Sequence, residues 1–296
     1  MSDFRIMIPT RGRLNSQQTL MSLGPLQNMA ILVCPTAEVA GLSKAWPEAD
    51  IVAQPDGITT IATKRQWMMD WAHSNNIEKV LMMDDDLFFY YRYWNPTARF
   101  WKHKEAVGDW RLLDSDMDNT SWWIHALMNQ ISAEIPQGGF GPRQGNDKTD
   151  GGWLKGGNRL MLAMAYHVPT FHNLGIRFDR VKFREDFDVA LQFYGKGLPS
   201  VLTNDFCVGQ KSFAAPGGCT GERTIEGSDT AALELSQLHP PGIVRIVDRA
   251  YKGSPRKEVI IGWKRALLAG GYPPYKAGVD KDAKDSNGYP ISGNRD

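Results

Sequence analysis

The stretch "KVLMMDDDLFFY" (residues 79–90) places three consecutive aspartates directly after a largely apolar run. A short apolar run of this kind is typical of a buried strand in a parallel sheet. Three like charges at the end of a strand repel one another, so we expect a cation or a ligand to balance Asp84, Asp85 and Asp86. Alternate residues of an extended segment share a face, so we expect Asp84 and Asp86 to point together and Asp85 to point away.

Two carboxylates on one face indicate a divalent metal. Mg²⁺ and Mn²⁺ prefer oxygen ligands and commonly combine one or two carboxylates with the phosphate oxygens of a substrate. The alternative is an acidic turn that faces solvent. Apolar residues flank the acids on both sides, at 81–83 and 87–90. This flanking favours a metal–diphosphate site.

The first third of the chain alternates strands and helices. Short apolar runs predict strands at residues 4–8, 30–34, 50–53 and 79–83. Between the last two strands, residues 58–76 have apolar side chains at roughly helical spacing. This alternation predicts a doubly wound, mostly parallel α/β sheet with helices on both faces. Such sheets bind ligands at the carboxyl ends of their strands.

The sequence after residue 91 indicates fewer regular helices and strands than the first third. We expect a helix over 121–135 with Ser121 as N-cap, a long glycine-rich loop over 136–158, a strand over 159–168, a helix over 184–197 and a strand over 200–208. We expect one domain over 1–270, with a nucleotide-binding half (1–91) and an acceptor-binding half with an acceptor-side extension (92–270). Residues 271–296 predict a flexible tail.

Composition restricts the function classes. The 296 residues carry a net charge of +1, which by itself indicates neither a nucleic-acid nor a membrane partner. Cys34, Cys207 and Cys219 are far apart, and we interpret them as reduced thiols of a cytoplasmic protein. Asp3 and Arg5 interrupt any early apolar run, so we expect neither a signal peptide nor a membrane span.

The stretch "PTRGR" (9–13) follows the first strand, where a doubly wound sheet usually meets its nucleotide. Arg11 and Arg13 can contact a base or a phosphate, and Gly12 allows close approach of the backbone. Lys64 and Arg65 add positive charge at the same edge of the sheet. The alternative is an ordinary basic loop in solvent.

The stretch "REDFDVALQFY" (184–194) places Glu185 and Asp186 in the first turn of a helix. The helix dipole favours an ionised carboxylate there by about 0.3–1 kcal/mol. A general base requires such a carboxylate beside the acceptor hydroxyl. The alternative is a pair of acids that only compensates the dipole. If Asp186 is not the base, Glu185 is the first substitute and Asp188 the second.

Taken together, these motifs resemble the nucleotide-sugar glycosyltransferases of the GT-A fold. The matching segments are "IMIPTRGR" (6–13), "ILVCPTAE" (31–38), "MMDDDLFF" (82–89) and "REDFDVAL" (184–191). With "GFGPRQGND" (139–147), "APGGCTGERT" (215–224) and "VIIGWKRA" (259–266), the chain is more closely similar to the TET-associated glycosyltransferases. That family, which includes phage relatives, is assigned to the glycosylation of hydroxymethylated pyrimidines in DNA.

The resemblance implies a metal-dependent, inverting enzyme that uses a UDP-sugar (glucose or arabinose) with Mn²⁺ or Mg²⁺. The resemblance and the adjacent residues of the same motifs give the following candidates for donor binding: Pro9, Thr10, Arg11, Arg13, Glu38, Lys64, Asp84 and Asp85. Asp86 binds the metal together with Asp84. A late histidine completes the metal shell in many GT-A enzymes, and His239 is the best-placed candidate, although it also fits an ordinary surface residue.

The acceptor implied by the resemblance is 5-hydroxymethylcytosine in phage DNA, where a sugar blocks host nucleases in the host cytoplasm. The candidate acceptor residues are Arg143, Asn146, Trp153, Gly217, Gly218, Arg223, Lys264 and Arg265, and Trp94 and Trp101 are further aromatic candidates to stack on a flipped base. Two alternatives stay open. One is a GT-A enzyme acting on a saccharide or a protein, and the other is a non-catalytic nucleotide- or DNA-binding module.

Overall fold

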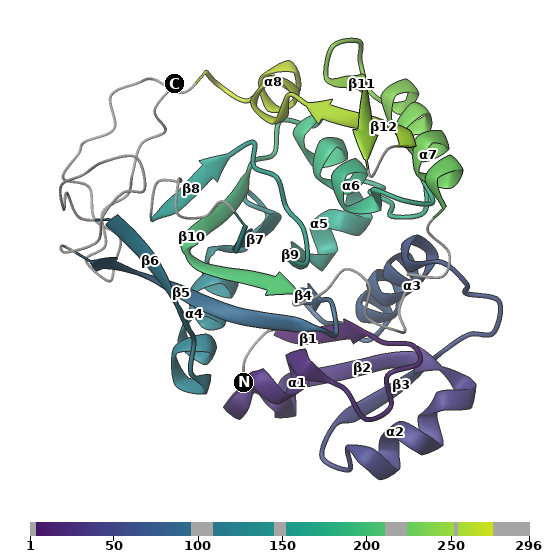
Figure 1. The fold of residues 1–296 in the computed structure, drawn as a ribbon, viewed down its shortest axis with the longest axis vertical. Helices are drawn as coiled ribbons and strands as arrows, with labels where there is room; N and C mark the ends of the chain where they lie inside the picture. Colours follow the sequence, from purple (N-terminus) through teal and green to yellow (C-terminus); the bar gives the residue numbers. More distant parts are fainter. Residues whose placement is uncertain (1–3, 96–108, 145–151, 211–223, 252–253, 275–296) are drawn as a thin grey trace.

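The computed structural model of the chain describes residues 4–95, 109–144, 152–210, 224–251 and 254–274 (Figure 1). One sheet runs through its centre, with the strand order β3-β2-β1-β4-β9-β7-β10-β5-β6, and β8 pairs with β10. The N-terminal part of this sheet is wholly parallel. It comprises β1 (Phe4–Pro9), β2 (Ala30–Pro35), β3 (Asp50–Gln54) and β4 (Lys79–Met83). The four strands predicted for this part of the chain are confirmed.

The parallel strands are apolar throughout because both faces of the sheet are covered. Ile6 and Ile8 of β1 point into one hydrophobic core, and Met7 between them points into another. On the first face lie α1 (Gln18–Ser22), η1 (Gly24–Met29), η2 (Thr36–Glu38), α2 (Val39–Ala45) and α4 (Met117–Gln130), with Leu20, Leu42 and Leu127 in the core. On the second face lies α3 (Ile61–Ser74), which contributes Met68 and Met69. The predicted doubly wound α/β class is confirmed.

The sheet continues without a break into the chain after the three aspartates. Its strands are β5 (Leu87–Asn95), β6 (Asp109–Asp114), β7 (Gln137–Pro142), β8 (Trp153–Gly156), β9 (Ala163–His167) and β10 (Ser200–Gln210). β9 runs antiparallel between β4 and β7, whereas β7 and β10 are parallel. β5 follows the three aspartates directly and pairs with β10, with Gln210 opposite Leu87. The end of β4 therefore lies beside the end of β10.

Two predicted elements differ from the structure. The helix predicted over 121–135 is Met117–Gln130, because the Asp116 side chain accepts the Asn119 N–H at 2.7 Å and begins the helix earlier than Ser121. The loop predicted over 136–158 contains β7 and β8. Its glycines allow close packing: a Cβ at Gly138 would come 2.9 Å from the Val201 carbonyl oxygen, and one at Gly139 would come 2.7 Å from that of Ala163.

A C-terminal group of elements packs against α6 (Glu185–Tyr194), at the top of Figure 1. It contains α7 (Ile225–Leu238), β11 (Val244–Tyr251), β12 (Ser254–Ile261) and α8 (Trp263–Ala269), and α5 (Val168–Asn173) precedes α6. Leu191 and Tyr194 of α6 share a third hydrophobic core with Leu235, Ile243 and Leu267. Neither α7 nor the β11–β12 ribbon is predicted from the sequence.

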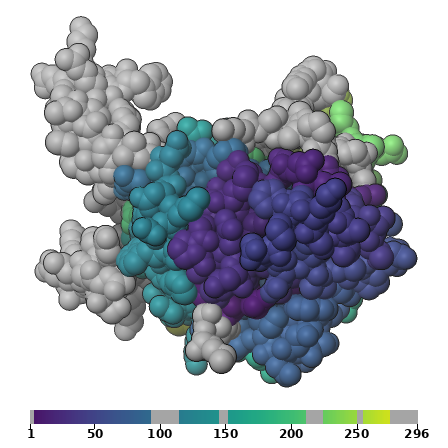
Figure 2. All heavy atoms as spheres, turned by 90° about the horizontal axis from the view of Figure 1, so that it is seen from below, coloured from purple at the N-terminus to yellow at the C-terminus, as the bar shows by residue number. Residues whose placement is uncertain are grey.

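From below, the purple to blue N-terminal segments form one continuous surface (Figure 2). Among the described residues, no helix is both long and apolar enough to cross a membrane. The tail predicted over 271–296 lies outside the described residues from 275 onward.

Candidate active site

The three aspartates divide as their spacing predicts, with Asp85 turned into the protein. Its exposed fraction is 6 %. Thr10 Oγ1 donates a hydrogen bond to Asp85 Oδ2 at 2.7 Å, and Arg13 pairs with Oδ1. Burial raises the pKa of Asp85 to about 6, against the opposing effects of Thr10 and Arg13. Asp85 therefore holds the 9–13 loop from inside the fold.

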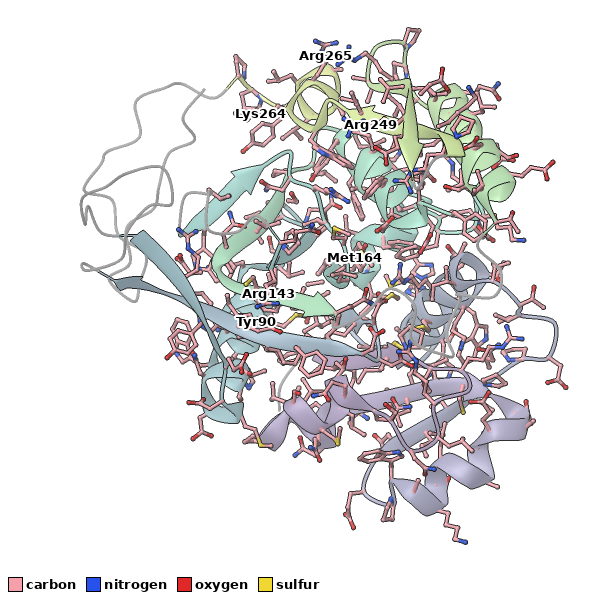
Figure 3. All side chains as sticks on the ribbon, in the orientation of Figure 1. Tyr90, Arg143, Met164, Arg249, Lys264 and Arg265 are labelled. Atoms are coloured by element: carbon pink, nitrogen blue, oxygen red, sulfur yellow. The ribbon has the colours of Figure 1, made fainter. Side chains whose placement is uncertain are left out.

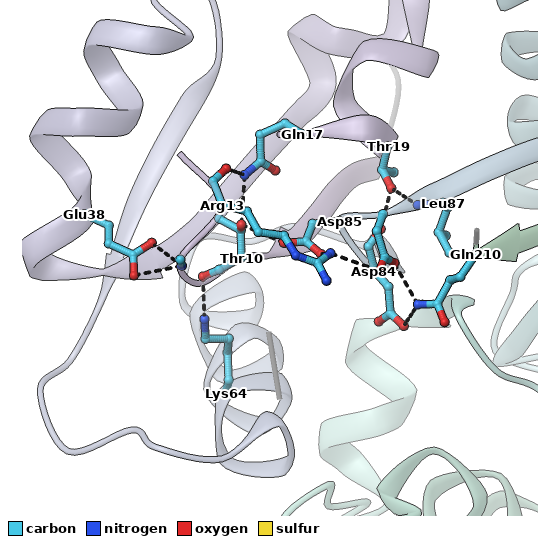
Figure 4. A network of polar contacts seen from close by, with 12 residues as sticks. Thr10, Arg13, Gln17, Thr19, Glu38, Lys64, Asp84, Asp85, Leu87 and Gln210 are labelled. Carbon is cyan, nitrogen blue, oxygen red and sulfur yellow. Dashed lines mark hydrogen bonds and ion pairs between the residues drawn. The ribbon is translucent and has the colours of Figure 1, made fainter. Parts of the chain in front are cut away.

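Asp84 and Asp86 face a common partner, the side chain of Gln210 (Figure 4). Gln210 Nε2 lies 3.4 Å from Asp84 Oδ2 and 2.7 Å from Asp86 Oδ1. The second oxygen of each carboxylate is held by an arginine: Arg65 Nη2 lies 2.7 Å from Asp84 Oδ1, and Arg13 Nη1 lies 3.0 Å from Asp86 Oδ2. One oxygen of each aspartate thus converges on the same amide nitrogen.

This donor set fits a hard divalent cation. A cation held at this place would have Asp84 Oδ2 and Asp86 Oδ1 as carboxylate ligands, and Gln210 carries an amide oxygen on the same side chain. Within the described residues, no three His, Cys, Asp or Glu side chains lie together as a metal-binding group. A cation held by two carboxylates would have coordination positions open to other oxygen ligands.

The prediction of His239 as a metal ligand requires correction. His239 Nε2 lies 2.7 Å from Asp188 Oδ1, and Asp188 also accepts from Gln192 Nε2 at 2.8 Å. Asp188 is fully buried, and the His239 side chain is 7 % exposed. His239, which follows α7, therefore connects the end of α7 to α6 through this contact with Asp188. Asp188 is equally unsuited to be a substitute base, because no acceptor can reach it.

The 9–13 loop is held from several directions. Gly12 has a φ of 71°, and its N–H donates to both carboxylate oxygens of Glu38, at 3.0 and 2.9 Å. Gln17 Nε2 donates to Thr10 Oγ1 and to the Arg13 carbonyl, both at 2.8 Å. Pro9 and Thr10 are buried, whereas Arg11 is exposed. The loop presents a fixed backbone and one outward arginine at the carboxyl ends of β1 and β2.

Lys64 supports this loop from behind. Its ammonium donates to the Thr10 carbonyl at 3.0 Å and lies 3.5 Å from the Val33 carbonyl, and the side chain is buried. The sequence predicts Lys64 as a donor-binding residue. The structure places its ammonium against backbone carbonyl oxygens at the ends of β1 and β2. Its observed contacts are therefore with the protein.

The start of α6 lies across the site from the aspartates, and Arg65 connects the two. Arg65 Nη1 pairs with Glu185 Oε1 at 2.6 Å while Nη2 pairs with Asp84. Both Arg65 and Glu185 are 5 % exposed. Glu185 therefore forms an internal ion pair, whereas Asp186 in the same turn is half-buried and forms no ion pair among the described residues.

The pKa of Asp186 is raised, whereas the helix dipole alone predicts a lowered pKa. Burial raises the pKa of Asp186, and the charge of Arg65 and the N–H of Phe187, which donates at 2.9 Å, only partly oppose this rise. No other hydrogen bond reaches the Asp186 carboxylate from the described part of the chain. A raised pKa makes this carboxylate a stronger base than an exposed aspartate.

Only some of the predicted acceptor residues can be placed. Arg143 is exposed beyond β7, and its guanidinium lies 4.6 Å above the ring centre of Tyr90 (Figure 3). Trp153 packs against Trp123, with 6.0 Å between ring centres. Lys264 and Arg265 are exposed on α8. Asn146, Trp101, Gly217, Gly218 and Arg223 lie outside the described residues, as does the side chain of Trp94.

Sequence reasoning missed the contacts of three polar residues. These are Gln17, Gln210 and Thr19, whose hydroxyl donates to the Asp84 carbonyl at 2.5 Å and accepts the Leu87 N–H at 2.9 Å. The sequence signal is weak: Gln210 ends an apolar strand, Gln17 directly precedes α1 and Thr19 lies within it. Arg65 was recognised only as a positive charge.

A family model for the TET-associated glycosyltransferases matches residues 4–218. This match includes both aspartates of the D-x-D pair, the 9–13 loop and the start of α6. The chain belongs to the TET-associated glycosyltransferase family. By this membership it is a glycosyltransferase, and comparison with curated proteins gives no significant match.

Solved structures similar to this glycosyltransferase are distant in sequence. GalNAc-T7 with UDP, GalNAc and Mn²⁺ is 10 % identical with a TM-score of 0.44, and the match covers 70 % of this chain and 43 % of that one. Mannose-1-phosphate geranyltransferase from Thermus thermophilus is 11 % identical, with a TM-score of 0.39 and coverage of 91 % and 98 %. The 4-diphosphocytidyl-2C-methyl-D-erythritolsynthase from Anaerococcus prevotii is 10 % identical, with a TM-score of 0.39 and coverage of 79 % and 95 %.

Proposed function

We propose that this glycosyltransferase moves a sugar from a UDP-sugar onto the hydroxymethyl group of 5-hydroxymethylcytosine in DNA, with a divalent metal and inversion at the anomeric carbon. One observation carries the proposal. Asp84 Oδ2 and Asp86 Oδ1 both lie at Gln210 Nε2, and Arg65 links Asp84 to the turn that carries Asp186.

The donor site follows from the 9–13 loop and the aspartates. The nucleotide lies against Thr10 and Arg11 at the carboxyl ends of the parallel strands. Asp84 and Asp86 would hold the metal, Mn²⁺ or Mg²⁺, which would supply positive charge against the departing diphosphate. Arg13 already neutralises Asp85 and Asp86, so it keeps the acids together before the donor binds.

The reaction needs one proton acceptor. Asp186 takes the proton of the acceptor hydroxyl as its oxygen bonds to the anomeric carbon. The bond between that carbon and the diphosphate oxygen breaks, and UDP leaves with the electron pair. Because attack and departure occur on opposite sides of the carbon, one displacement inverts its configuration. The raised pKa of Asp186 supports this role, since a higher pKa makes a carboxylate a stronger base.

The acceptor is proposed from the family and from surface charge. Membership in the TET-associated family favours hydroxymethylated DNA, and in a phage such a sugar protects the DNA from host nucleases in the host cytoplasm. Exposed Lys264 and Arg265 suit a phosphate backbone. A base inside a duplex has to be flipped out before it can react, at a cost of roughly a few kcal/mol. A saccharide or protein acceptor is the second candidate, favoured by the aromatic residues 90–94 of β5.

The test is incubation of the enzyme with UDP-glucose or UDP-arabinose, Mn²⁺ and a duplex that contains 5-hydroxymethylcytosine, followed by mass spectrometry of the digested nucleosides. A hexose or pentose adduct on 5-hydroxymethylcytosine, and none on unmodified cytosine duplex, is expected. UDP release stimulated by a saccharide or a protein, without any nucleoside adduct, would support the second candidate. Tight UDP binding without transfer to any acceptor would leave a non-catalytic module.

A further inference from the structure

The β11–β12 ribbon has one face turned inward and one turned outward. Val244 pairs with Ile261 and Ile246 with Val259, and three of these four side chains contribute to the core shared with α6 and α8. Directly opposed residues of an antiparallel pair lie on the same face, and successive residues alternate between faces. The pairs Arg245–Ile260, Val247–Glu258 and Arg249–Arg256 therefore form the outward face.

This outward face is basic. Arg245 is exposed, the Arg249 side chain is 62 % exposed, and that of Arg256 is 37 % exposed. The one acid among the three outward pairs, Glu258, accepts ion pairs from both Arg249 and Arg256, so it neutralises one charge of the three. Exposed Lys264 and Arg265 follow on α8, and Arg265 Nη1 donates to the Gly242 carbonyl at the base of the ribbon (Figure 3). We call Arg245, Arg249, Arg256, Lys264 and Arg265 the basic face.

The ribbon is joined directly to the turn that carries the base. Arg184, two residues before Asp186, lies 3.4 Å from the Lys257 carbonyl of β12 and 3.2 Å from Ser228 Oγ of α7. Arg184 has a left-handed backbone with a φ of 66°, an uncommon conformation for a residue with a side chain. The charges of both Arg256 and Asp186 act on its guanidinium, whose pKa is lowered by burial and by Arg256 and raised by Asp186. Arg184 therefore connects the ribbon and α7 to the turn that carries Asp186.

We propose that the basic face binds the phosphate backbone of the acceptor DNA and brings the target nucleotide to Asp186. This inference rests on the proposed function, since it assigns the DNA acceptor to a surface. Arg245 and Arg249 lie four residues apart on one strand, about 14 Å at roughly 3.4 Å per residue. That length is comparable to the rise over several phosphates, since each strand of a duplex has one phosphate per about 3.4 Å of helix axis. The basic face carries five cationic side chains, and Glu258 is the one acid among its ribbon pairs. A neutral saccharide has no negative charge that could pair with these cations.

The test compares the wild type with the double variant Arg249→Gln/Arg256→Gln. Binding to a 30-base-pair duplex is measured by fluorescence anisotropy at several salt concentrations. We expect the affinity of the variant to fall about tenfold and the slope of log K against log salt to fall by about 2, because two phosphate contacts are lost. The matched control, Arg5→Gln/Lys44→Gln, removes two cations from the nucleotide-binding half and is expected to leave both quantities unchanged.

A second measurement separates this inference from the proposed function. Transfer onto free 5-hydroxymethyl-2′-deoxycytidine needs the donor site and Asp186 but no phosphate backbone. We expect the double variant to retain this transfer within about twofold while its KM for duplex rises. If it binds duplex as the wild type does, or if the control variant loses as much affinity, the basic face is not the DNA-binding surface. Absence of transfer to the nucleoside and to duplex in the wild type would instead contradict the proposed function.

Discussion

At the scale of the residue, the site depends on neighbouring acids that the fold places in different environments. Asp84 and Asp86 share one face of an extended segment, and Asp85 between them is buried against Thr10. Glu185 and Asp186 are adjacent in one helical turn, yet only Glu185 is paired with Arg65. The acids within each of these two motifs are similar in charge and in residue type. Their different environments therefore come from the contacts that each side chain makes.

Asp186→Asn is expected to lower the rate of sugar transfer about 10²–10⁴-fold, because asparagine keeps the shape of the side chain and cannot accept the proton. UDP affinity, measured by calorimetry, should stay within about twofold. Asp179→Asn is the matched control, since Asp179 is an aspartate near the surface that is paired with Arg177. Near wild-type transfer by Asp186→Asn would show that another group is the base.

The acid side of the pH–rate profile should report the environment of Asp186. Burial raises the pKa of Asp186, and only the deprotonated form is a base, so kcat/KM is expected to fall as the pH decreases through this raised pKa. The midpoint should lie above the value of 3.8 for an unperturbed aspartate. The measurement is kcat/KM against pH, with thermal unfolding recorded at each pH. A midpoint at or below 3.8, with the protein folded throughout, would contradict the assignment.

At the scale of the element, Arg65 is the connection between β4 and α6. It is carried by α3, and its guanidinium reaches the end of β4 through Asp84 and the start of α6 through Glu185. The buried guanidinium of Arg65 pairs with two carboxylates, and a buried charge without a partner would lower the stability of the fold. The relative position of the metal-binding acids and the base therefore depends on α3.

Arg65→Met is expected to lower the free energy of unfolding by about 3–5 kcal/mol, because two carboxylates in a largely buried place lose their partner. Glu185→Gln removes one of the two pairs. The double variant should lose less than the sum of the single variants, with a coupling energy of about 0.5–3 kcal/mol measured by urea unfolding.

The control for this cycle is the pair Arg5–Asp50, which joins β1 and β3 near the surface. Its coupling energy is expected to be about 1 kcal/mol or less, because solvent screens exposed pairs. Additive effects of Arg65→Met and Glu185→Gln would show that the two residues do not act as one unit.

At the scale of the whole molecule, one continuous sheet supports both substrates. The parallel half places the 9–13 loop and the aspartates at its carboxyl edge, and β9, β7 and β10 extend the same sheet to Gln210. The C-terminal elements are attached to α6 through their own core and through His239 and Asp188. The parallel strands and the C-terminal elements therefore meet at β4, β10 and α6.

UDP with Mn²⁺ is expected to stabilise the whole fold, because both bind only the folded protein. At about 100 times the dissociation constant, this adds roughly 2.7 kcal/mol, or about 4 °C in Tm for a chain of this size. EDTA should remove most of the shift, and Asp86→Ala should abolish it. A shift that is equal with and without EDTA, or equal in Asp86→Ala, would contradict metal binding at the aspartates.

The amino-acid sequence by itself determined the features that depend on local periodicity. Continuous apolar runs predicted the four parallel strands, and the two-residue period of an extended chain predicted that Asp84 and Asp86 face one way and Asp85 the other. The motif order also indicated the family before any fold was known. These features need only near neighbours along the chain, so a sequence pattern records them.

Only the tertiary structure decided which distant side chains meet. Arg65 and Glu185 are 120 residues apart, and Asp84 and Gln210 are 126 apart. No periodicity encodes such pairs, because packing of the whole sheet brings them together. The same holds for His239, which packing places at Asp188, and for Asp186, whose pKa is raised by burial although its position in the helix alone predicts the opposite.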